Sequence, residues 1–167
     1  MINRPDGKPR QAYAQLLANL HSQSGGPHPG PTLRFGGNSA EESCYAATGI
    51  PPPNSSHCTH KITAQDLSAY RRFAEIAPNI SYVIDTNLMQ GDAAVGAAHV
   101  SAVGAAGLWP YIQAVEIGNE CDHWPPSDQL KFADYEQRFA AFAEAYKAAG
   151  MPPKFIQGAT FCCLNPA

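Results

Sequence analysis

Asn119 and Glu120 place an amide next to a carboxylate, directly after the apolar run of residues 115–118. The end of such a strand lies on the rim of a sheet, where α/β enzymes bind their ligands. There a carboxyl group can protonate a leaving group, and an amide can hold a substrate hydroxyl. A strand-end Glu can also simply cap the next turn, and a lone Asn is a common turn residue. The pattern therefore indicates candidate acid–base chemistry that needs supporting residues.

Two further segments support that chemistry through a family resemblance. The sequence LRFGGNS at residues 33–39 and the sequence EIGNECDHW at residues 116–124 together resemble the catalytic barrel of glycoside hydrolase family 79, the heparanase and β-glucuronidase group. An apolar run ending in Asn87 lies between them, where the family has a strand ending in Gly-x-Asn. The resemblance covers about residues 32–161. Glu41 stands where the family usually has Asp, and Cys121 where it usually has Pro.

The resemblance implies a retaining glycosidase that hydrolyses β-glucuronides or related uronic-acid-containing glycans. Glu120 matches the general acid/base, a role that needs a carboxyl group with a raised pKa. Asn119 matches a residue that binds the sugar 2-hydroxyl. The further substrate contacts expected on the same rim are Gly36, Gly37, Asn38, Glu41 and Asn87. The glycine pair could instead form a plain turn. Trp124 matches an aromatic position and either stacks on a sugar ring or packs beneath the loop.

The second carboxylate of such an enzyme, the nucleophile, lies in this family near the seventh barrel strand. Retaining enzymes place it about 5–5.5 Å from the acid. Glu41 and Asp122 are nearby carboxylates, but neither matches the nucleophile position. We therefore expect the 167-residue chain to lack hydrolase activity by itself. The alternative function is that of a non-catalytic carbohydrate-binding or interaction fragment, truncated or degenerate.

Helical and apolar patterns alternate along the chain and predict an α/β fold with a parallel sheet. The helices are expected at about residues 13–20, 63–76, 92–105 and 127–146, and the strands at about 33–35, 81–88, 113–118 and 154–160. Thr63 with Asp66 reads as one helix start, and Ser127 as another. Residues 38–62 are expected to form a long irregular loop. By the resemblance, residues 1–167 form a single partial (β/α)8 TIM barrel domain containing strands two to five.

Arg34 and Glu116 are expected to pair inside this barrel. Counting back by twos, Arg34 shares a face with Gly36, and Glu116 shares a face with Glu120. Their strands would be the second and fourth of the barrel, which are alternate strands and feed the same interior layers. A buried charge needs a partner. The alternative is that one of the two side chains reaches the edge of the sheet.

The chain has five cysteines, and we expect two disulfides. Cys44 and Cys58 would close the long loop, and Cys121 would bridge to Cys162 or Cys163. The rival interpretation is a zinc site with four ligands: Cys44, His57, Cys58 and His60. It lacks the spacing of a C-x2-C motif, and two of its ligands are adjacent residues. We therefore expect no metal and no cofactor.

The net charge of −3 argues against binding to nucleic acid or to an anionic membrane. The sequence has no apolar run of about 20 residues that could span a membrane, and its start does not resemble a signal peptide. The cysteines and the family resemblance favour an extracellular or endomembrane/lysosomal location for the intact protein. The expected partners are a uronic-acid-containing glycan and a second copy, which would associate through the open half-barrel.

Overall fold

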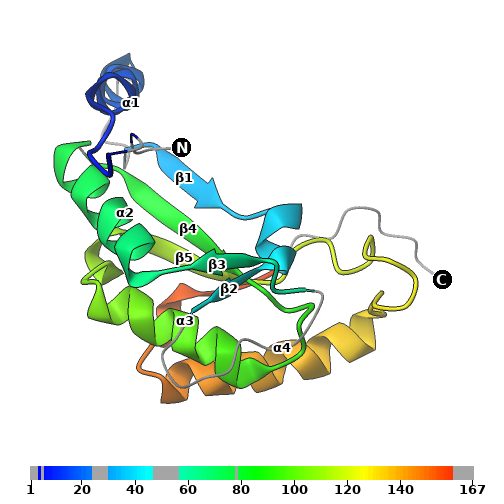
Figure 1. The fold of residues 1–167 in the computed structure, drawn as a ribbon. Helices are drawn as coiled ribbons and strands as arrows, with labels where there is room; N and C mark the ends of the chain where they lie inside the picture. Colours follow the sequence, from blue (N-terminus) through cyan, green and yellow to red (C-terminus); the bar gives the residue numbers. More distant parts are fainter. Residues whose placement is uncertain (1–3, 5, 24–29, 47–56, 78, 160–167) are drawn as a thin grey trace.

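The computed structural model describes residues 4, 6–23, 30–46, 57–77 and 79–159. Its central sheet has the strand order β1-β4-β5-β6, and every neighbouring pair is parallel (Figure 1). The strands are β1 (Thr32–Phe35), β4 (Ser81–Thr86), β5 (Ile112–Ile117) and β6 (Ile156–Gly158). The predicted parallel sheet is therefore confirmed. Its place within a barrel remains a prediction.

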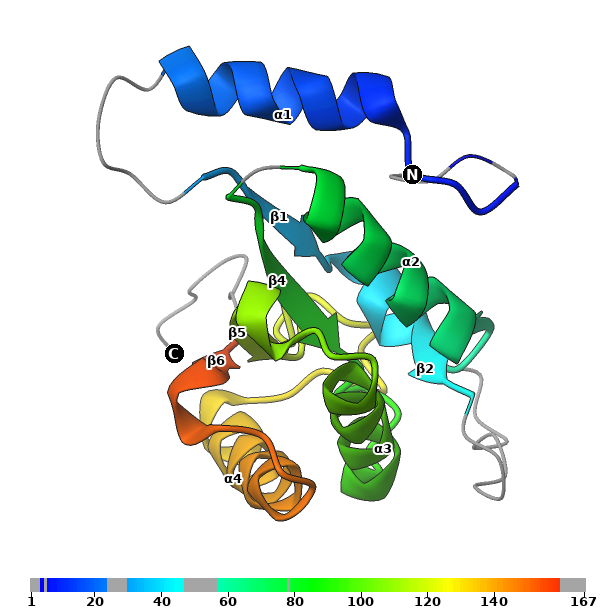
Figure 2. The same cartoon turned by 90° about the vertical axis from the view of Figure 1, so that its left-hand side faces the viewer.

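The helices α2 (Ala64–Ile76), α3 (Ala93–Ala105) and α4 (Phe132–Ala148) cover one face of this sheet (Figure 2). The described residues also form α1 (Gln11–Gln23) and the short 3-10 turns η1 (Asn38–Glu42), η2 (Trp109–Tyr111) and η3 (Pro153–Phe155). Figure 2 shows α2, α3 and α4 packed along the sheet, whereas α1 lies apart, beside α2. Each crossover between the parallel strands therefore carries a helix, as in α/β folds.

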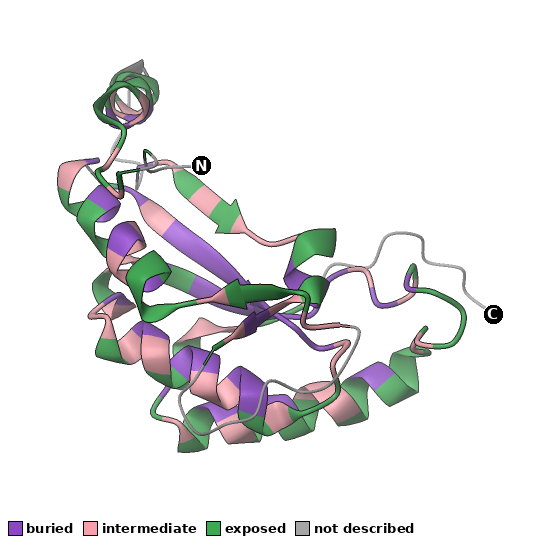
Figure 3. Cartoon of the chain, viewed as in Figure 1, coloured by how far each residue is buried: buried purple, intermediate pink, exposed green. Residues whose placement is uncertain are grey.

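The two faces of the sheet differ in chemistry. One face contributes strand side chains to the hydrophobic core: Leu33, Phe35, Tyr82, Ile84, Ile112, Val115, Ile117 and Ile156. On the other face Asp85, Glu116 and Gln157 stand in register on β4, β5 and β6. Figure 3 shows that β4 is buried along most of its length, whereas the edge strand β1 alternates between exposed and intermediate residues. The polar row therefore lies on the face that the helices leave uncovered.

The segment predicted as one irregular loop is partly regular. After η1 come β2 (Ser43–Tyr45) and β3 (His60–Ile62), which pair in parallel as a separate two-stranded sheet. Residues 47–56 lie outside the described residues. The predicted Cys44–Cys58 disulfide is confirmed, with a Cα–Cα distance of 5.3 Å. Three-residue strands carry too little hydrophobic pattern to be seen in a sequence.

The start of α2 follows the predicted capping box. The Thr63 N–H donates to Asp66 Oδ2 at 2.9 Å, and the Asp66 N–H donates to Thr63 Oγ1 at 3.3 Å. These reciprocal bonds satisfy two of the amide groups that a helix start leaves without intrahelical acceptors.

The predicted cap of α4 at Ser127 is wrong. The helix begins after Lys131, and the Ser127 hydroxyl donates instead to Asp128 at 2.9 Å. The Leu130 N–H donates to the Cys121 carbonyl at 3.1 Å. This bond ties the chain back to the loop after β5, so the helix starts later than the cap signal suggests.

Candidate functional site

Three predicted rim residues lie at one edge of the sheet. Gly37, Asn87 and Glu120 each follow the carboxyl end of a strand, respectively β1, β4 and β5. Because these strands are parallel, their carboxyl ends meet at the same edge, and this prediction is confirmed. Thr160, expected near the same edge, lies outside the described residues. The rim is therefore where chemistry-bearing side chains gather.

A pocket of about 360 Å³ opens at this rim. Its lining residues are Asn38, Glu41, Glu42, His57, Met89, Glu120, His123, Trp124 and Pro125. Such a volume is at the lower end of the range for small-molecule sites. Of the predicted residues, Asn38, Glu41, Glu120 and Trp124 line it. The sequence interpretation missed His123, although it stands only three residues after Glu120.

Glu120 reaches the pocket through an unusual backbone conformation. Its φ is 43°, in the left-handed region that non-glycine residues seldom adopt. Gly118 before it has φ 82°, and a Cβ there would come within 2.9 Å of the Leu88 side chain. The His123 N–H donates to the Glu120 carbonyl at 2.7 Å and closes the turn. Strain held in this way is common at functional sites.

Asn119 is held at every polar atom. Its N–H donates to Glu41 Oε1 at 2.6 Å, and its carbonyl accepts from Trp124 Nε1 at 2.8 Å. Its side-chain Oδ1 accepts from Arg34 Nη2 at 2.9 Å, and Nδ2 donates to Asn38 Oδ1 at 3.2 Å. Asn119 is 4% exposed. Its amide therefore anchors the rim, and the expected contact with a sugar hydroxyl remains a prediction.

Trp124 packs rather than standing free. It is buried in the hydrophobic core, and its indole N–H bonds to the Asn119 carbonyl. It still forms part of the pocket wall. Packing beneath the loop is therefore observed, and stacking on a sugar ring stays a prediction.

Glu41 was expected to bind the sugar, and its carboxylate is occupied by the protein backbone. Oε2 accepts from the Leu88 N–H at 3.1 Å and from the Met89 N–H at 3.0 Å, and Oε1 accepts from Asn119. The residue is 2% exposed. Burial raises the pKa of its carboxyl group to about 7, although the hydrogen bonds from the three backbone N–H groups lower it.

Asn87 joins three segments of the rim. Its Nδ2 donates to the Glu41 carbonyl at 2.8 Å and to the His57 carbonyl at 2.6 Å, and its Oδ1 accepts from the Gln90 N–H at 3.0 Å. It is buried and does not line the pocket. The residue predicted as a substrate contact therefore braces the pocket wall that carries His57.

The predicted ion pair beneath the rim is confirmed. Arg34 Nε lies 2.6 Å from Glu116 Oε2, and the Glu116 side chain is fully buried. The Arg34 side chain is 40% exposed and also reaches Asp85 Oδ2 at 3.5 Å. The hydrogen bond that Arg34 donates to Glu116 is the main cause that raises the pKa of Arg34. One guanidinium thus faces two buried carboxylates.

Asp85 is a member of this cluster that the sequence interpretation missed, although it lies two residues before Asn87 and therefore on the same strand face. Its Oδ2 accepts from the Gly37 N–H at 3.3 Å, while its Oδ1 is buried without a hydrogen-bond partner. Burial, reinforced by Glu41 and Glu116, raises its pKa to about 8. A Cβ at Gly36 would lie 2.7 Å from the Asp85 Cβ, so this glycine permits close packing.

The zinc interpretation finds no support in the described part of the chain. Cys44 and Cys58 are joined to each other, and the described residues contain no cluster of three or more potential ligands arranged to hold a metal ion. The second predicted bridge is wrong at Cys121, which is a buried free thiol whose pKa burial raises to about 12. It packs in the hydrophobic core. Its proposed partners, Cys162 and Cys163, lie outside the described residues.

The described helices include none with the length and apolarity needed to cross a bilayer. No protein-family model matches the sequence, and no curated protein matches it. The fold is similar to part of a crystal structure, that of a 4-O-α-L-rhamnosyl-β-D-glucuronidase from Fusarium oxysporum 12S in complex with Rha-GlcA, with a TM-score of 0.62 and 19% identity over 83% of this chain. The chain spans 31% of the length of that enzyme. The parallel sheet and its flanking helices are therefore arranged as in part of a glycosidase.

Proposed function

We propose that this chain carries the acid/base half of a retaining glycosidase site, with Glu120 as the proton donor. One observation carries the proposal: Glu120 leaves β5 in a left-handed conformation and lines the rim pocket. A carboxyl group so placed can protonate a glycosidic oxygen and later activate water. The substrate class, β-glucuronides or related uronic-acid-containing glycans, is supported by the name of the structurally similar enzyme and by the family 79 motifs.

The proposal includes a partial (β/α)8 barrel, with β1, β4, β5 and β6 as strands two to five. Sequential parallel strands with helical crossovers support it, as does a polar row on the face without helices. We also propose an oxidising compartment, extracellular or endomembrane/lysosomal, in which the Cys44–Cys58 disulfide would persist.

The nucleophile is expected from another strand of the barrel. Of the carboxylates in the pocket, Glu41 is held by three backbone amides and is poorly placed to attack a sugar carbon. Without an opposing carboxylate, the oxocarbenium-like transition state lacks its main stabilising partner. We therefore expect the 167-residue chain to bind a glucuronide and to leave it intact.

The test compares methyl β-D-glucuronide with methyl β-D-glucoside by isothermal titration calorimetry on the 167-residue chain. We expect preferential binding of the glucuronide and no release of nitrophenol from 4-nitrophenyl β-D-glucuronide. In a longer chain that contains the remaining strands, Glu120→Gln should abolish most turnover of poor leaving groups and less turnover of activated aryl groups. The matched change Glu144→Gln, on the exposed surface of α4, should alter neither.

Equal loss on both leaving-group classes would contradict the acid role. The second candidate, a non-catalytic sugar-binding fragment, is favoured by the commitment of the Asn119 and Glu41 polar atoms to protein partners. This second candidate predicts that the 167-residue chain and the longer chain both bind the glucuronide and that neither shows Glu120-dependent turnover. Glu120-dependent hydrolysis by the 167-residue chain would contradict the proposal that this chain carries the acid/base and lacks the nucleophile.

A further inference from the structure

We infer that Glu41 is a positioning residue whose ionised carboxylate holds the Gly118–Asn119 peptide, directly before Glu120, and that this hold weakens when the carboxylate takes up a proton. This inference rests on the proposed function of Glu120. It departs from the sequence expectation, in which Glu41 contacts the sugar directly.

The geometry around Glu41 is that of a clasp. The residue lies in η1, yet its carboxylate receives N–H groups from the ends of two strands: Leu88 and Met89 after β4, and Asn119 after β5. The bond to Asn119 is the shortest of the three at 2.6 Å. Hydrogen bonds from backbone N–H groups to an ionised carboxylate are about twice as strong as hydrogen bonds between neutral groups. The Gly118–Asn119 peptide therefore donates its N–H to a charged group, while the Asn119 carbonyl accepts from Trp124.

The two oxygens of this carboxylate accept different numbers of hydrogen bonds. Oε2 accepts two N–H groups, and Oε1 accepts only that of Asn119. A protonated carboxyl oxygen carries an O–H donor and keeps only part of its capacity to accept an N–H group. Protonation at Oε2 would weaken two hydrogen bonds, whereas protonation at Oε1 would weaken one. We therefore expect the proton at Oε1, where it weakens the bond from the Asn119 N–H.

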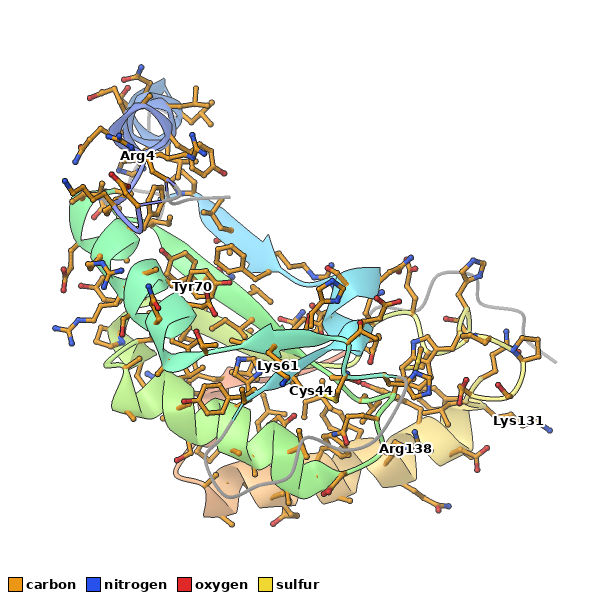
Figure 4. The ribbon with its side chains drawn as sticks, in the orientation of Figure 1. Arg4, Cys44, Lys61, Tyr70, Lys131 and Arg138 are labelled. Carbon is orange, nitrogen blue, oxygen red and sulfur yellow. A yellow bond between two sulfur atoms is a disulfide. The ribbon has the colours of Figure 1, made fainter. Side chains whose placement is uncertain are left out.

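Other charged and titratable groups surround the clasp. Asp85 faces it from β4, Cys121 from the loop after β5, and Tyr146 from α4. Arg138 also belongs to α4 (Figure 4). Burial raises the pKa of Glu41, whereas the three backbone N–H groups and, to a lesser extent, Arg138 lower it, and the pKa lies at about 7 as a result. The clasp should accordingly be closed above neutral pH and open below it.

Nuclear magnetic resonance tests the clasp without any ligand. In the ¹⁵N-labelled 167-residue chain, we expect the Asn119 amide proton to shift upfield as the pH falls from 9 to 5, with smaller shifts at Leu88 and Met89. The midpoint should match that of the Glu41 carboxyl carbon, observed by ¹³C. Glu41→Gln should abolish the amide titration, whereas Glu144→Gln, the same chemical change on exposed α4, should preserve it.

Three outcomes would overturn the clasp: amide titration that persists in Glu41→Gln, absence of titration between pH 5 and 9, or a midpoint unlike that of the Glu41 carbon. The last two are read from the unsubstituted chain and hold even if Glu41→Gln does not fold. The affinity for methyl β-D-glucuronide separates this inference from the proposed function. Binding of methyl β-D-glucuronide that does not depend on the protonation of Glu41 would contradict only the clasp. Absence of binding at every pH would contradict the proposed function, and the amide titration would still test the clasp.

Discussion

Beneath the rim, a single guanidinium serves two carboxylates, and the three groups differ in their access to water. Glu116 is fully buried and Asp85 is 4% exposed, whereas the Arg34 side chain is 40% exposed. Water can therefore replace a lost carboxylate beside Arg34, but it cannot replace the cation beside the buried carboxylates. The two sides of the cluster should respond differently to substitution.

Arg34→Met should destabilise the fold by roughly 3–5 kcal/mol at pH 7, because it removes the cation from the fully buried Glu116 carboxylate. Glu116→Gln should cost only about 1–3 kcal/mol, since Arg34 keeps Asp85, Asn119 and partial hydration. Urea unfolding of both variants measures the difference. A larger loss in Glu116→Gln than in Arg34→Met would contradict this account.

The raised pKa of Asp85, about 8, makes stability depend on pH. A carboxyl group whose pKa is higher in the folded state stabilises the fold at low pH, and that contribution is lost as the pH rises through the folded value. Between about pH 4 and 8 the free energy of unfolding should fall by up to about 1.4 kcal/mol per pH unit from this group. Asp85→Asn should remove this part of the decline. The stability of the variant relative to the unsubstituted chain should therefore be higher at pH 9 than at pH 5.

Chemical denaturation of both proteins at pH 5, 7 and 9 measures the effect, with Asp134→Asn as a matched control in the first turn of α4, where the residue is exposed. Parallel curves for Asp85→Asn and the unsubstituted chain would show that Asp85 titrates normally.

At the scale of elements, a capping box marks where α2 begins. Thr63→Ala should destabilise the protein by about 0.5–2 kcal/mol, because it removes the Oγ1 atom that accepts from the Asp66 N–H. Asp66→Ala should cost a similar amount, and the double variant should cost less than the sum, since the two residues form one unit. Ser101→Ala, on the exposed face of α3, is the control and should stay within about 0.5 kcal/mol. Additive losses would argue against a coupled box.

The long elements were predictable because each buries a regular stripe or ends at a recognisable cap. The helix α2 has both a buried stripe and a capping box, and β4 and β5 are mostly buried strands built around short apolar runs. The strands β2 and β3 were missed, because three residues and a disulfide define them rather than a pattern. The start of α4 was wrongly predicted at Ser127 because the Leu130 N–H donates to the Cys121 carbonyl, and no local sequence pattern reveals this hydrogen bond.

For the candidate site, sequence predicted the residues better than their contacts. Glu120 and Asn119 stand at the expected rim, and Arg34 pairs as expected with Glu116. The role of Glu41 could not be read from residue types, because its partners are backbone amides of residues 47, 48 and 78 positions away.

At the scale of the whole molecule, the described sheet has β1 and β6 as its outer strands. Outer strands present unpaired backbone groups that can join another chain. We expect the 167-residue chain to self-associate, so that its weight-average mass in sedimentation equilibrium rises with concentration. A longer chain that completes the barrel should remain monomeric under the same conditions. A monomer at all concentrations in the shorter chain would show that these edges are protected.

The hydrogen bond between Glu41 and Asn119 spans 78 residues, and this distance has a consequence during synthesis. At roughly 5–20 residues per second, a ribosome delivers Asn119 about 4–16 s after Glu41. Throughout that interval the buried acid of η1 has no backbone amide from β5 to bind. The Cys44–Cys58 disulfide closes over only 14 positions and can form first. In a nascent chain, the wall of the pocket would therefore be covalently shaped before Glu120, which lines the same pocket, has been translated.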